Sequence, residues 1–418
     1  MIKTQNRLIR DDFHIDLDLS GVHPSEYESN SICSQLPIIW HKAKDFCVYD
    51  EGGNKWIDLT SGIFAMNAGH SNPVINDAIK DQLDSDMVFS FLYQSSIRQQ
   101  LARRLLQISP PHFQKVVLLS TGSEATDMAY KLIKYWAKRN NKKYIVSFRG
   151  SYHGRVLSGD LLSGGENNSE WSGAVDDSIV FLDFPYNPAD NFDPSSLPPA
   201  DQIAAFFLET YQGWSAQLYP DQYITQLYKF AKQNNCLVCF DEIQAGFYRM
   251  GKTYGYMTYG EQIKPDIVCL GKALSAPLPL SAVLSTKELI DGAKKIGGTH
   301  AGNPLCCAAA IANIDFLSDD KFQRELKRKI EIFERRFRQL TMYESVKYVN
   351  VRGMIGAIMF HRKQDANRVV VECIKNGVMP VNTWSTSIKI GPPLTISVAA
   401  IEEAFNVIEI CIMRAEDE

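Results

Sequence analysis

Short apolar runs alternate with amphipathic stretches through the middle of the chain. Most of these runs are apolar on both faces, which is typical of strands in a parallel sheet with helices on both sides. We expect strands at 115–120, 143–148, 178–184, 203–209, 236–241 and 266–271. After the first of them, apolar residues at alternating spacings of three and one predict an amphipathic helix: Ala125, Met128, Ala129, Leu132, Ile133 and Trp136. The pattern predicts an α/β fold with a mostly parallel central sheet.

The pattern changes near residue 308. A long helical stripe is followed by strand-like runs at 346–351, 354–360 and 387–390, and then by an amphipathic helix from residue 398. This order predicts a smaller α+β domain. The strand–turn–strand pattern FCVYDEGGNKWIDL near the N-terminus is expected to pack with it. We therefore expect an N-terminal segment at 1–65, a large domain at 66–307 and a small domain at 308–418.

Composition and charge exclude several classes of protein. The chain has 418 residues, with 44 Lys+Arg against 48 Asp+Glu and no basic block, so we expect it to bind neither nucleic acid nor an anionic membrane. No apolar run approaches the roughly 20 residues that cross a bilayer, and the N-terminus lacks the apolar core of a signal peptide. The nine cysteines, an odd number in a long chain, fit a reducing cytoplasm better than a disulfide scaffold.

Two of the cysteines, Cys236 and Cys239, form a CxxC pair. They lie in an expected strand, where residues three apart point to opposite faces. Core packing is therefore favoured over a redox or metal site, and we expect no metal.

The first candidate for chemistry is LLSTGSEATDMAYKLIK, where a strand runs into a helix. Gly122 and Ser123 would lie at the helix N-terminus, where backbone N–H groups and the helix dipole favour an anion. A plain helix cap followed by Glu124 is the alternative interpretation.

The second candidate is FDEIQAGF, in which a strand ends on Asp241 and Glu242, with Gln244 close behind. Sites in doubly wound sheets form at the carboxyl ends of strands. Strand alternation lets one carboxylate point into a site while the other points away. The alternative is a solvated strand end.

The third candidate is Lys272, in PDIVCLGKALS after another apolar strand. A dry pocket lowers the pKa of a lysine amine and allows it to form a Schiff base. A lysine that extends from a strand end to solvent is the alternative.

The fourth candidate is SFRGSYHGR, which places Tyr152, His153 and Arg155 after a strand. The tyrosine can stack on a planar cofactor, and the arginine can contact a carboxylate with two hydrogen bonds. For His153 alone, a structural hydrogen-bonded histidine is the favoured interpretation.

Together these strand ends would supply an anion site, a buried carboxylate, a lysine and a stacking aromatic ring. Pyridoxal 5'-phosphate (PLP) needs this set. Its phosphate takes the helix N-terminus, a carboxylate keeps the pyridine nitrogen protonated, and a lysine holds the aldehyde and later moves a proton.

Beyond these residues, the chain resembles the class III (ornithine/4-aminobutyrate type) aminotransferases, which are fold type I PLP-dependent transferases. The resemblance runs from about Tyr49 to the C-terminus. It begins with DEGGNKWIDLTSGIFAMNAGHSNP at 50–73, and later motifs follow in the family's order: STGSEA, SYHGR, ETYQG, FDEIQAGFYRMG, PDIVCLGK, GGTHAGNPLCCAAA and IKIGPPLTIS. It implies a homodimer with shared active sites, a small-molecule amine donor and a keto or aldehyde acceptor.

The resemblance also implies residue roles. Lys272 would form the Schiff base with PLP and act as the catalytic residue. The other residues expected to bind the cofactor are Gly122 and Ser123 at the phosphate, Tyr152 on the ring, Glu209, Asp241 at the pyridine nitrogen, Gln244 at the ring hydroxyl, and Thr299 at the phosphate of the neighbouring subunit. Those expected at the substrate are Ile63, Arg155, Trp214 and Lys389.

Departures from the family pattern concern the substrate. The family's arginine before PPL, which grips a carboxylate, is here Lys389, and lysine lacks the planar fork for a two-point contact. The family's QGEGG is here QGWSA, so Trp214 stands near the place of the glutamate that would pair with that arginine. Ile63 falls where ornithine enzymes have a tyrosine. We therefore expect an unusual substrate pair in a specialised, biosynthetic pathway.

Two alternatives remain open at this stage. Another PLP reaction, such as that of a decarboxylase or aminomutase, would use the same cofactor residues, because pocket geometry decides which bond breaks. A non-catalytic binding module would keep the fold, but the presence of both Lys272 and Asp241 argues against it.

Overall fold

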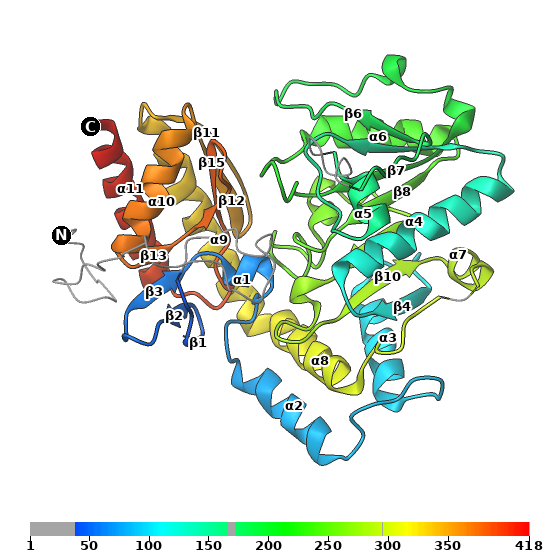
Figure 1. Ribbon diagram of the computed structural model, residues 1–418, viewed down its shortest axis with the longest axis horizontal. Helices are drawn as coiled ribbons and strands as arrows, with labels where there is room; N and C mark the ends of the chain where they lie inside the picture. The colour runs from blue at the N-terminus through cyan, green and yellow to red at the C-terminus, as the bar shows by residue number, and fades with distance from the viewer. Residues whose placement is uncertain (1–37, 165–171, 295, 418) are drawn as a thin grey trace. The chain divides into compact units, whose positions relative to one another are not determined.

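A computed structural model describes residues 38–164, 172–294 and 296–417. The chain divides into two compact units: one combines residues up to Asn72 with those from Asp319 on, and the other is the continuous middle of the chain, Pro73–Ser318. Figure 1 shows the elements of each. No helix in these described ranges has the length and apolar character needed to cross a membrane.

The middle unit is built on a sheet with the strand order β4-β10-β9-β8-β7-β5-β6. Its strands are β4 (Lys115–Leu119), β5 (Tyr144–Phe148), β6 (Ile179–Leu182), β7 (Ile203–Glu209), β8 (Leu237–Asp241), β9 (Ile267–Leu270) and β10 (Ser281–Ser285). The pairs β5–β6, β5–β7, β7–β8 and β8–β9 are parallel, and β10 is antiparallel to both β4 and β9. The strands expected from the sequence are confirmed, and β10 is an addition that the pattern did not predict.

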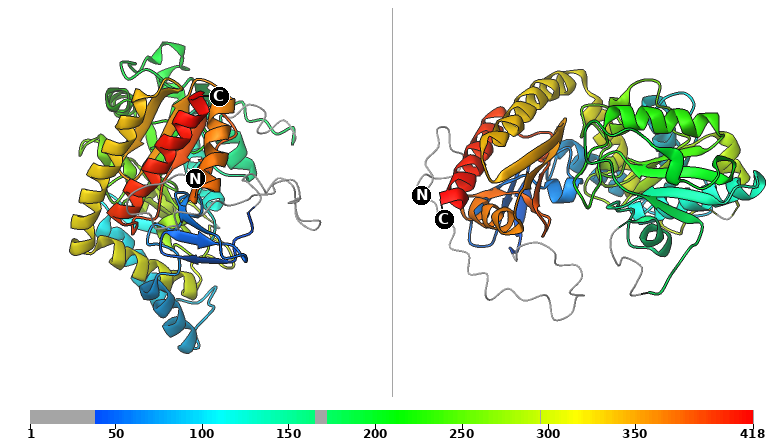
Figure 2. Two further views of the ribbon diagram at one scale, coloured as in Figure 1. Left: turned by 90° about the vertical axis from the view of Figure 1, so that its left-hand side faces the viewer. Right: turned by 90° about the horizontal axis from the view of Figure 1, so that it is seen from above.

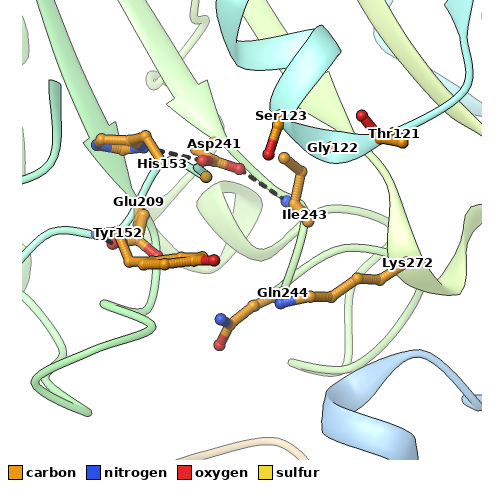
Figure 3. Close-up of a pocket in the computed structure, with 11 residues that line it drawn as sticks. Thr121, Gly122, Ser123, Tyr152, His153, Glu209, Asp241, Ile243, Gln244 and Lys272 are labelled. Carbon is orange, nitrogen blue, oxygen red and sulfur yellow. Dashed lines mark hydrogen bonds and ion pairs between the residues drawn. The ribbon is translucent and has the colours of Figure 1, made fainter. Parts of the chain in front are cut away.

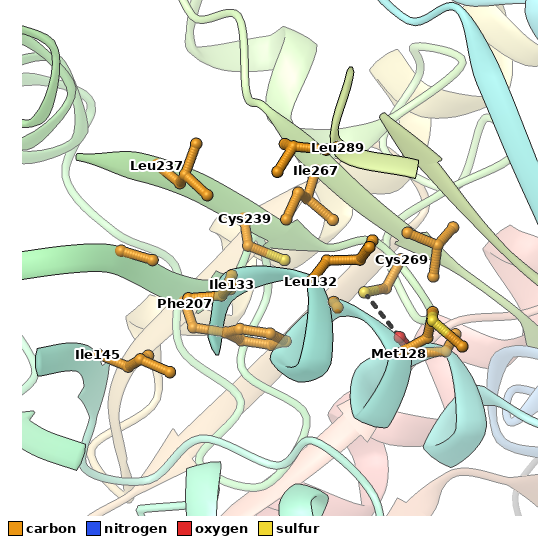
Figure 4. Close-up of a cluster of buried hydrophobic side chains, with 14 of the residues drawn as sticks. Met128, Leu132, Ile133, Ile145, Phe207, Leu237, Cys239, Ile267, Cys269 and Leu289 are labelled. Atoms are coloured by element: carbon orange, nitrogen blue, oxygen red, sulfur yellow. Dashed lines mark hydrogen bonds between the residues drawn. The ribbon is translucent and has the colours of Figure 1, made fainter. Parts of the chain in front are cut away.

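Helices cover both faces of this sheet. On one face, α4 (Gly122–Arg139) packs its apolar stripe onto the core cluster that contains Phe207 and Cys239, as Figure 4 shows. Phe206 points to the other face, where its ring meets that of Phe230 on α6 (Asp221–Gln233) 6.1 Å away. Because neighbouring residues of a strand face opposite sides, β7 is buried by both layers. Each large apolar side chain buried in this way contributes about 1.5–3 kcal/mol to folding.

The remaining elements of the middle unit surround the sheet. The helices are α2 (Pro73–Asp84), α3 (Ser96–Ile108), α5 (Leu157–Leu162), α7 (Lys287–Gly292) and α8 (Pro304–Ser318). The 3₁₀ turns are Pro194–Ser196, Ala200–Gln202, Gly255–Tyr259 and Lys272–Leu274. The helix α8 is apolar around most of its circumference because α2 and α3 both pack against it.

The other unit contains two small sheets. The first has the order β1-β2-β3-β13, with β1 (Lys42–Lys44), β2 (Cys47–Tyr49), β3 (Lys55–Asp58) and β13 (Val378–Met379). The second is antiparallel, with the order β11-β12-β15-β14: β11 (Val346–Arg352), β12 (Ile355–Phe360), β15 (Ser387–Ile390) and β14 (Val381–Asn382). The helices are α1 (Ser61–Phe64), α9 (Asp320–Gln339), α10 (Lys363–Lys375) and α11 (Val398–Asp417), with a 3₁₀ turn at Leu340–Met342. Figure 2 shows α9 and α11 side by side on this unit.

Distant parts of the chain meet in this unit. The strands β3 and β13 pair in parallel, with Ile57 opposite Val378. Beside them, the indole Nε1 of Trp56 donates to the carbonyl of Ile374 at 2.9 Å, and Trp56 is fully buried. The N-terminal hairpin is therefore part of the same core as α10.

Candidate active site

The carboxyl ends of β4, β5, β7, β8 and β9 surround a pocket of about 170 Å³ in the middle unit, drawn in Figure 3. Its lining is Thr121, Gly122, Ser123, Tyr152, His153, Gly154, Glu209, Asp241, Ile243, Gln244 and Lys272. The parallel strands bring these residues together at one edge of the sheet, where sites form in this class of fold. All of the expected cofactor-binding residues except Thr299 are in this lining.

One end of the pocket is the N-terminus of α4. Thr121 caps the helix: its hydroxyl accepts the N–H of Glu124 at 3.2 Å, and the Glu124 carboxylate accepts the N–H of Thr121 at 2.8 Å. The helix cap is therefore present, and Gly122 and Ser123 lie in the first turn of the helix. Backbone N–H groups there point out of the helix end and favour an anion.

Gly154 makes this end narrow. Its φ is +103°, and a Cβ built on it would lie 2.3 Å from the Ser123 hydroxyl oxygen. The next residue, Arg155, donates its backbone N–H to the same hydroxyl at 3.2 Å. The position therefore requires glycine, and the segment 153–155 is held tightly against the start of α4.

A histidine–carboxylate pair lies on another wall. The Nδ1 atom of His153 is 2.9 Å from Oδ2 of Asp241, and Oδ1 of Asp241 accepts the N–H of Ile243 at 3.1 Å. The His153 ring also meets the edge of Phe207 with 4.7 Å between centroids. Its Nε2 atom is buried and has no hydrogen-bond partner among the described residues. His153 is thus a buried, hydrogen-bonded histidine, as expected from the sequence, and it also lines the pocket.

Glu209, the last residue of β7, joins two loops to the pocket. Its carboxylate accepts the backbone N–H groups of Tyr152 and Gly213, each at 2.8 Å. Burial raises the pKa of Glu209 to about 7; nearby His153 lowers it, and Asp241 raises it further. Glu209 therefore fixes the backbone from which the Tyr152 ring extends.

Asp241 and Glu242 point in different directions. Asp241 lines the pocket, whereas Glu242 is fully buried away from it. The Glu242 carboxylate accepts the hydroxyl of Thr210 and the backbone N–H groups of Gly255 and Tyr256. Burial raises the pKa of Glu242 to about 7, against the effect of these hydrogen bonds. Through these hydrogen bonds Glu242 connects the end of β8 to the turn at Gly255–Tyr259.

Lys272 follows β9 and begins a 3₁₀ turn with a φ of +43°. Burial lowers the pKa of its amine to about 8, while Asp241 and Glu209 act in the opposite direction. A substantial fraction of the amine is therefore neutral near pH 8, and the neutral amine is the form that attacks a carbonyl carbon.

Other expected site residues do not line this pocket. Arg155 and Thr299 are exposed in the middle unit, and so is Trp214, with 63% of its surface accessible. Ile63 and Lys389 belong to the other unit. There, the Lys389 Nζ atom lies 5.6 Å from the centroid of the Phe64 ring, next to Ile63 in sequence.

The segment that carries Ile63 has an uncommon backbone. Ser61, Gly62, Ile63 and Phe64 all have φ between +44° and +64°. The hydroxyl of Ser61 donates to the carbonyl of Gly391, and the N–H of Gly391 donates to the carbonyl of Leu59 at 2.7 Å. For the non-glycine residues Ser61, Ile63 and Phe64, a left-handed backbone costs of order 1–3 kcal/mol each and persists where the surroundings hold it in place. The segments that carry Ile63 and Lys389, both expected at the substrate, therefore lie next to each other in this unit.

Sequence reasoning left Thr121, His153, Gly154 and Ile243 out of the site. The signal for His153 and Gly154 was their position directly after Tyr152, at the end of an expected strand. Ile243 lies between Asp241 and Gln244, and its side chain closes on Gly122, where a Cβ would be 3.0 Å from it. A short loop that carries two site residues was the signal that could have indicated it.

Comparison with known proteins gives consistent results. The family model for class-III aminotransferases matches residues 29–412. Ornithine aminotransferase 2 of Staphylococcus aureus (strain Mu50 / ATCC 700699) is 30% identical over 381 residues, which are 89% of this chain and 93% of that protein. Ornithine aminotransferase of Oceanobacillus iheyensis is 28% identical over 386 residues, 90% of this chain and 93% of that protein.

Solved structures agree on the fold. The ornithine aminotransferase of Toxoplasma gondii ME49 superposes with a TM-score of 0.85 at 25% identity, covering 94% of this chain and 93% of that one. An amine transaminase from an uncultivated Pseudomonas species, solved in its PLP-bound form, has a TM-score of 0.84 at 22% identity, with 94% and 100% covered.

The pocket fits PLP on its own chemistry. It offers a helix N-terminus for a phosphate, a carboxylate for a protonated ring nitrogen, and an amine whose pKa is lowered for an aldehyde. The Oε1 atom of Gln244 is buried there without a hydrogen-bond partner among the described residues. Such an atom is costly unless a ligand or water satisfies it. With its matched family model, fold and site chemistry, the chain belongs to the class-III aminotransferases, PLP-dependent enzymes that move an amino group from an amine donor to a keto or aldehyde acceptor.

Proposed function

We propose that the pocket at the strand ends is the cofactor site of this aminotransferase and that Lys272 is its catalytic base. The proposal is carried by one observation: the Lys272 amine, whose pKa burial lowers to about 8, shares a pocket with Asp241 and with the N-terminus of α4. When bound, PLP supplies an electron-withdrawing ring that stabilises the charge left on a substrate carbon after it loses a proton. Lys272 holds the cofactor aldehyde at rest and moves the proton at Nζ in each half-reaction.

The other pocket residues orient the cofactor. Gly122 and Ser123 bind its phosphate through backbone N–H groups and a hydroxyl. Asp241, oriented by His153, pairs with the protonated ring nitrogen, and the amide of Gln244 binds the ring hydroxyl. The ring of Tyr152, whose backbone N–H donates to Glu209, stacks on the cofactor.

The active enzyme is proposed to be a homodimer in which Thr299 of each copy reaches the phosphate in the other copy. Two features support this. Thr299 is exposed and does not line the pocket of its own chain. Beside it lies an exposed apolar segment that includes Phe89, Phe91, Leu92 and Tyr93. The Phe89 ring is 5.3 Å from that of His300, so the segment and Thr299 belong to one surface. Contiguous exposed apolar surface of this kind is typical of protein interfaces.

We propose that Ile63, Arg155, Trp214 and Lys389 contact the substrates, and that the substrate pair is unusual and belongs to a specialised biosynthetic pathway. Lys389 supports this because its ammonium gives a point charge where the family has a planar fork. A second candidate is ornithine as donor, because the similar curated proteins are ornithine aminotransferases. A cytoplasmic location is also proposed, since every cysteine in the described ranges is a buried free thiol.

A donor screen tests these proposals. Purified holoenzyme is mixed with single amine donors, including ornithine and 4-aminobutyrate, and loss of the visible cofactor absorbance is followed. Lys272→Ala should abolish the change for every donor. Arg155→Ala should raise KM for donors with a distal carboxylate, and Lys389→Arg should improve turnover with 2-oxoglutarate as acceptor.

Each outcome decides a separate point. Equal activity with the common 4-aminobutyrate and 2-oxoglutarate pair would overturn the unusual substrate pair. Ornithine as the best donor would establish the second candidate. An unchanged reaction in Lys272→Ala would remove Lys272 from the chemistry. Mixed dimers of one Lys272→Ala chain and one Thr299→Ala chain test the shared sites. If Thr299 acts on the neighbouring copy, one of the two sites has both an intact lysine and an intact threonine, and that site should keep wild-type activity.

A further inference from the structure

Trp214 has a large apolar side chain that is exposed to solvent, and the residue lies in a loop next to the cofactor pocket. Its side chain is 63% exposed, although Tyr211 and Tyr219, which lie on either side of it in sequence, are fully buried. Trp214 lies in the loop that follows β7, whose last residue, Glu209, lines the pocket. An exposed indole leaves a wide apolar face without packing partners, and tryptophan in that setting is typical of binding surfaces.

Hydrogen bonds hold the loop that carries Trp214 in one conformation. Tyr211 and Leu218 form an antiparallel bridge at its base. Inside it, the Gln212 amide donates to the Arg149 carbonyl and to the Ser151 hydroxyl, each at 3.2 Å. The Ser215 hydroxyl donates back to the Gln212 side chain. The loop is therefore closed on itself and attached to the end of β5, so the backbone of Trp214 has little freedom.

The loop is also locked to the cofactor pocket through Gly213. Its N–H donates to the Glu209 carboxylate at 2.8 Å. A Cβ built on Gly213 would lie 2.4 Å from Nε2 of Gln244 and 3.0 Å from Oε1 of Glu209, so a side chain at this position would displace the Gln244 amide. Gly213 thus places Trp214, the next residue in the chain, close to two residues of the pocket lining, Glu209 and Gln244.

The chemistry of the loop is uncharged. Residues 210–217 read TYQGWSAQ and contain no ionisable acid or base other than a buried tyrosine. The loop itself therefore offers a substrate group an aromatic face and neutral polar groups, and the charged side chain of the adjoining Arg149 is paired with Asp183. Such a surface favours a hydrocarbon group, and a flat ring most of all, because aromatic pairs gain about 0.5–1.5 kcal/mol beyond area burial.

We propose that Trp214 is a specificity-determining residue whose indole packs on an apolar, ring-bearing part of the amine donor. The inference rests on the proposed function, because it takes the neighbouring pocket as the place where the amine reacts. It names the donor class as an amine with an aromatic or other flat hydrocarbon group that lies over the Trp214 indole.

The test uses holoenzyme and two donors, 2-phenylethylamine and propylamine, which differ in the ring. Single-turnover loss of the cofactor absorbance gives kcat/KM for each. Trp214→Ala should lower the ratio of kcat/KM for the ring donor to that for propylamine about threefold to tenfold, mainly through KM, and Trp214→Phe should restore most of it. The inhibition constant of 3-phenylpropan-1-ol, which has no amine to react, should rise by a similar factor in Trp214→Ala.

Tyr186→Ala is the matched control, because Tyr186 is an aromatic residue of the same unit with 61% exposure. It should leave the donor ratio and the inhibition constant unchanged. An equal loss for both donors, or no loss, in Trp214→Ala would overturn the inference. So would a weakened dimer with an unchanged donor ratio, which would assign the indole to contact with a second copy. If no donor changes the absorbance of wild-type holoenzyme, the proposed function itself fails, and the inference fails with it.

Discussion

The imidazole of His153 contacts the carboxylate of Asp241 with 2.9 Å between Nδ1 and Oδ2, and both side chains are buried. His153 follows β5 and Asp241 ends β8, so the contact joins segments 88 residues apart. A buried carboxylate that loses a hydrogen-bond donor costs about 1–3 kcal/mol.

We therefore expect His153→Leu to lower the stability of the protein by about this amount and to weaken PLP binding roughly tenfold or more. His153→Asn, which can still donate a hydrogen bond, should lose less. Thermal unfolding and a PLP titration followed by absorbance measure the two effects. Equal behaviour of the two variants would show that the hydrogen bond to Asp241 has no such role.

The pKa of Lys272 predicts a pH dependence for its reaction with aldehydes. Only the neutral amine reacts, and its fraction falls tenfold per pH unit below the pKa. Because burial lowers that pKa from 10.5 to about 8, the rate should rise between pH 6 and 8 and level off above about pH 8.

Apoenzyme, pyridoxal and a borohydride trap, with mass spectrometry of the Lys272 peptide, measure this rate. An exposed lysine such as Lys80 provides the internal comparison. A rate that keeps rising tenfold per unit to pH 10 would show that the pocket does not lower the pKa.

Gly154 should not tolerate a methyl group. Gly154→Ala combines a left-handed φ with a Cβ only 2.3 Å from the Ser123 hydroxyl oxygen, so the start of α4 must shift. We expect PLP affinity to fall at least tenfold, with a loss of stability of about 2 kcal/mol or more. Gly173→Ala is the control, since its φ is +66° but no atom lies within 4 Å of the added Cβ. Similar PLP affinities in the two variants would contradict the role of the close contact.

The buried Glu242 predicts a pH dependence of stability. Its folded-state pKa is raised from 4.5 to about 7, so the folded state holds a proton that the unfolded state has already released between these values. Stability should therefore decrease as pH rises from about 4.5 to 7, by about 1–3 kcal/mol from this group, and change little above that. Glu209 contributes in the same direction.

Glu242→Gln removes a titrating group and should flatten this decrease without abolishing it, because Glu209 remains. Urea unfolding at pH 5 and pH 8 gives the difference for each protein. Glu261→Gln, at an exposed position, is the control and should leave the wild-type difference unchanged. A difference as large in Glu242→Gln as in wild type would contradict the assignment.

Much of the fold followed from local pattern. The run at 203–209 is apolar at nearly every position, and it forms β7 with the same bounds because a strand buried on both faces tolerates little else. The strand β10 was missed: it begins and ends with serine and follows a proline-rich turn. Its antiparallel place between β4 and β9 depends on long-range pairing, which periodicity does not encode.

The candidate site divides in a similar way. Asp241 and Lys272 could be proposed from sequence because each follows a buried strand, and parallel strands end at one edge. The contact of His153 with Asp241 could not, because it depends on the relative register of β5, β7 and β8. The contact between Lys389 and the Phe64 ring joins segments about 325 residues apart, and no local pattern indicates it.

The hydrogen bond from Trp56 to Ile374 has a consequence for synthesis of the chain. These residues are 318 positions apart, so at roughly 5–20 residues per second the ribosome delivers the second about 15–60 seconds after the first. Until then β3 lacks its partner β13, and the apolar surface of Trp56 and Ile57, fully buried in the finished protein, has no core to enter. The continuous middle unit can complete its sheet earlier. The N-terminal hairpin is therefore made among the first elements and completes its packing among the last.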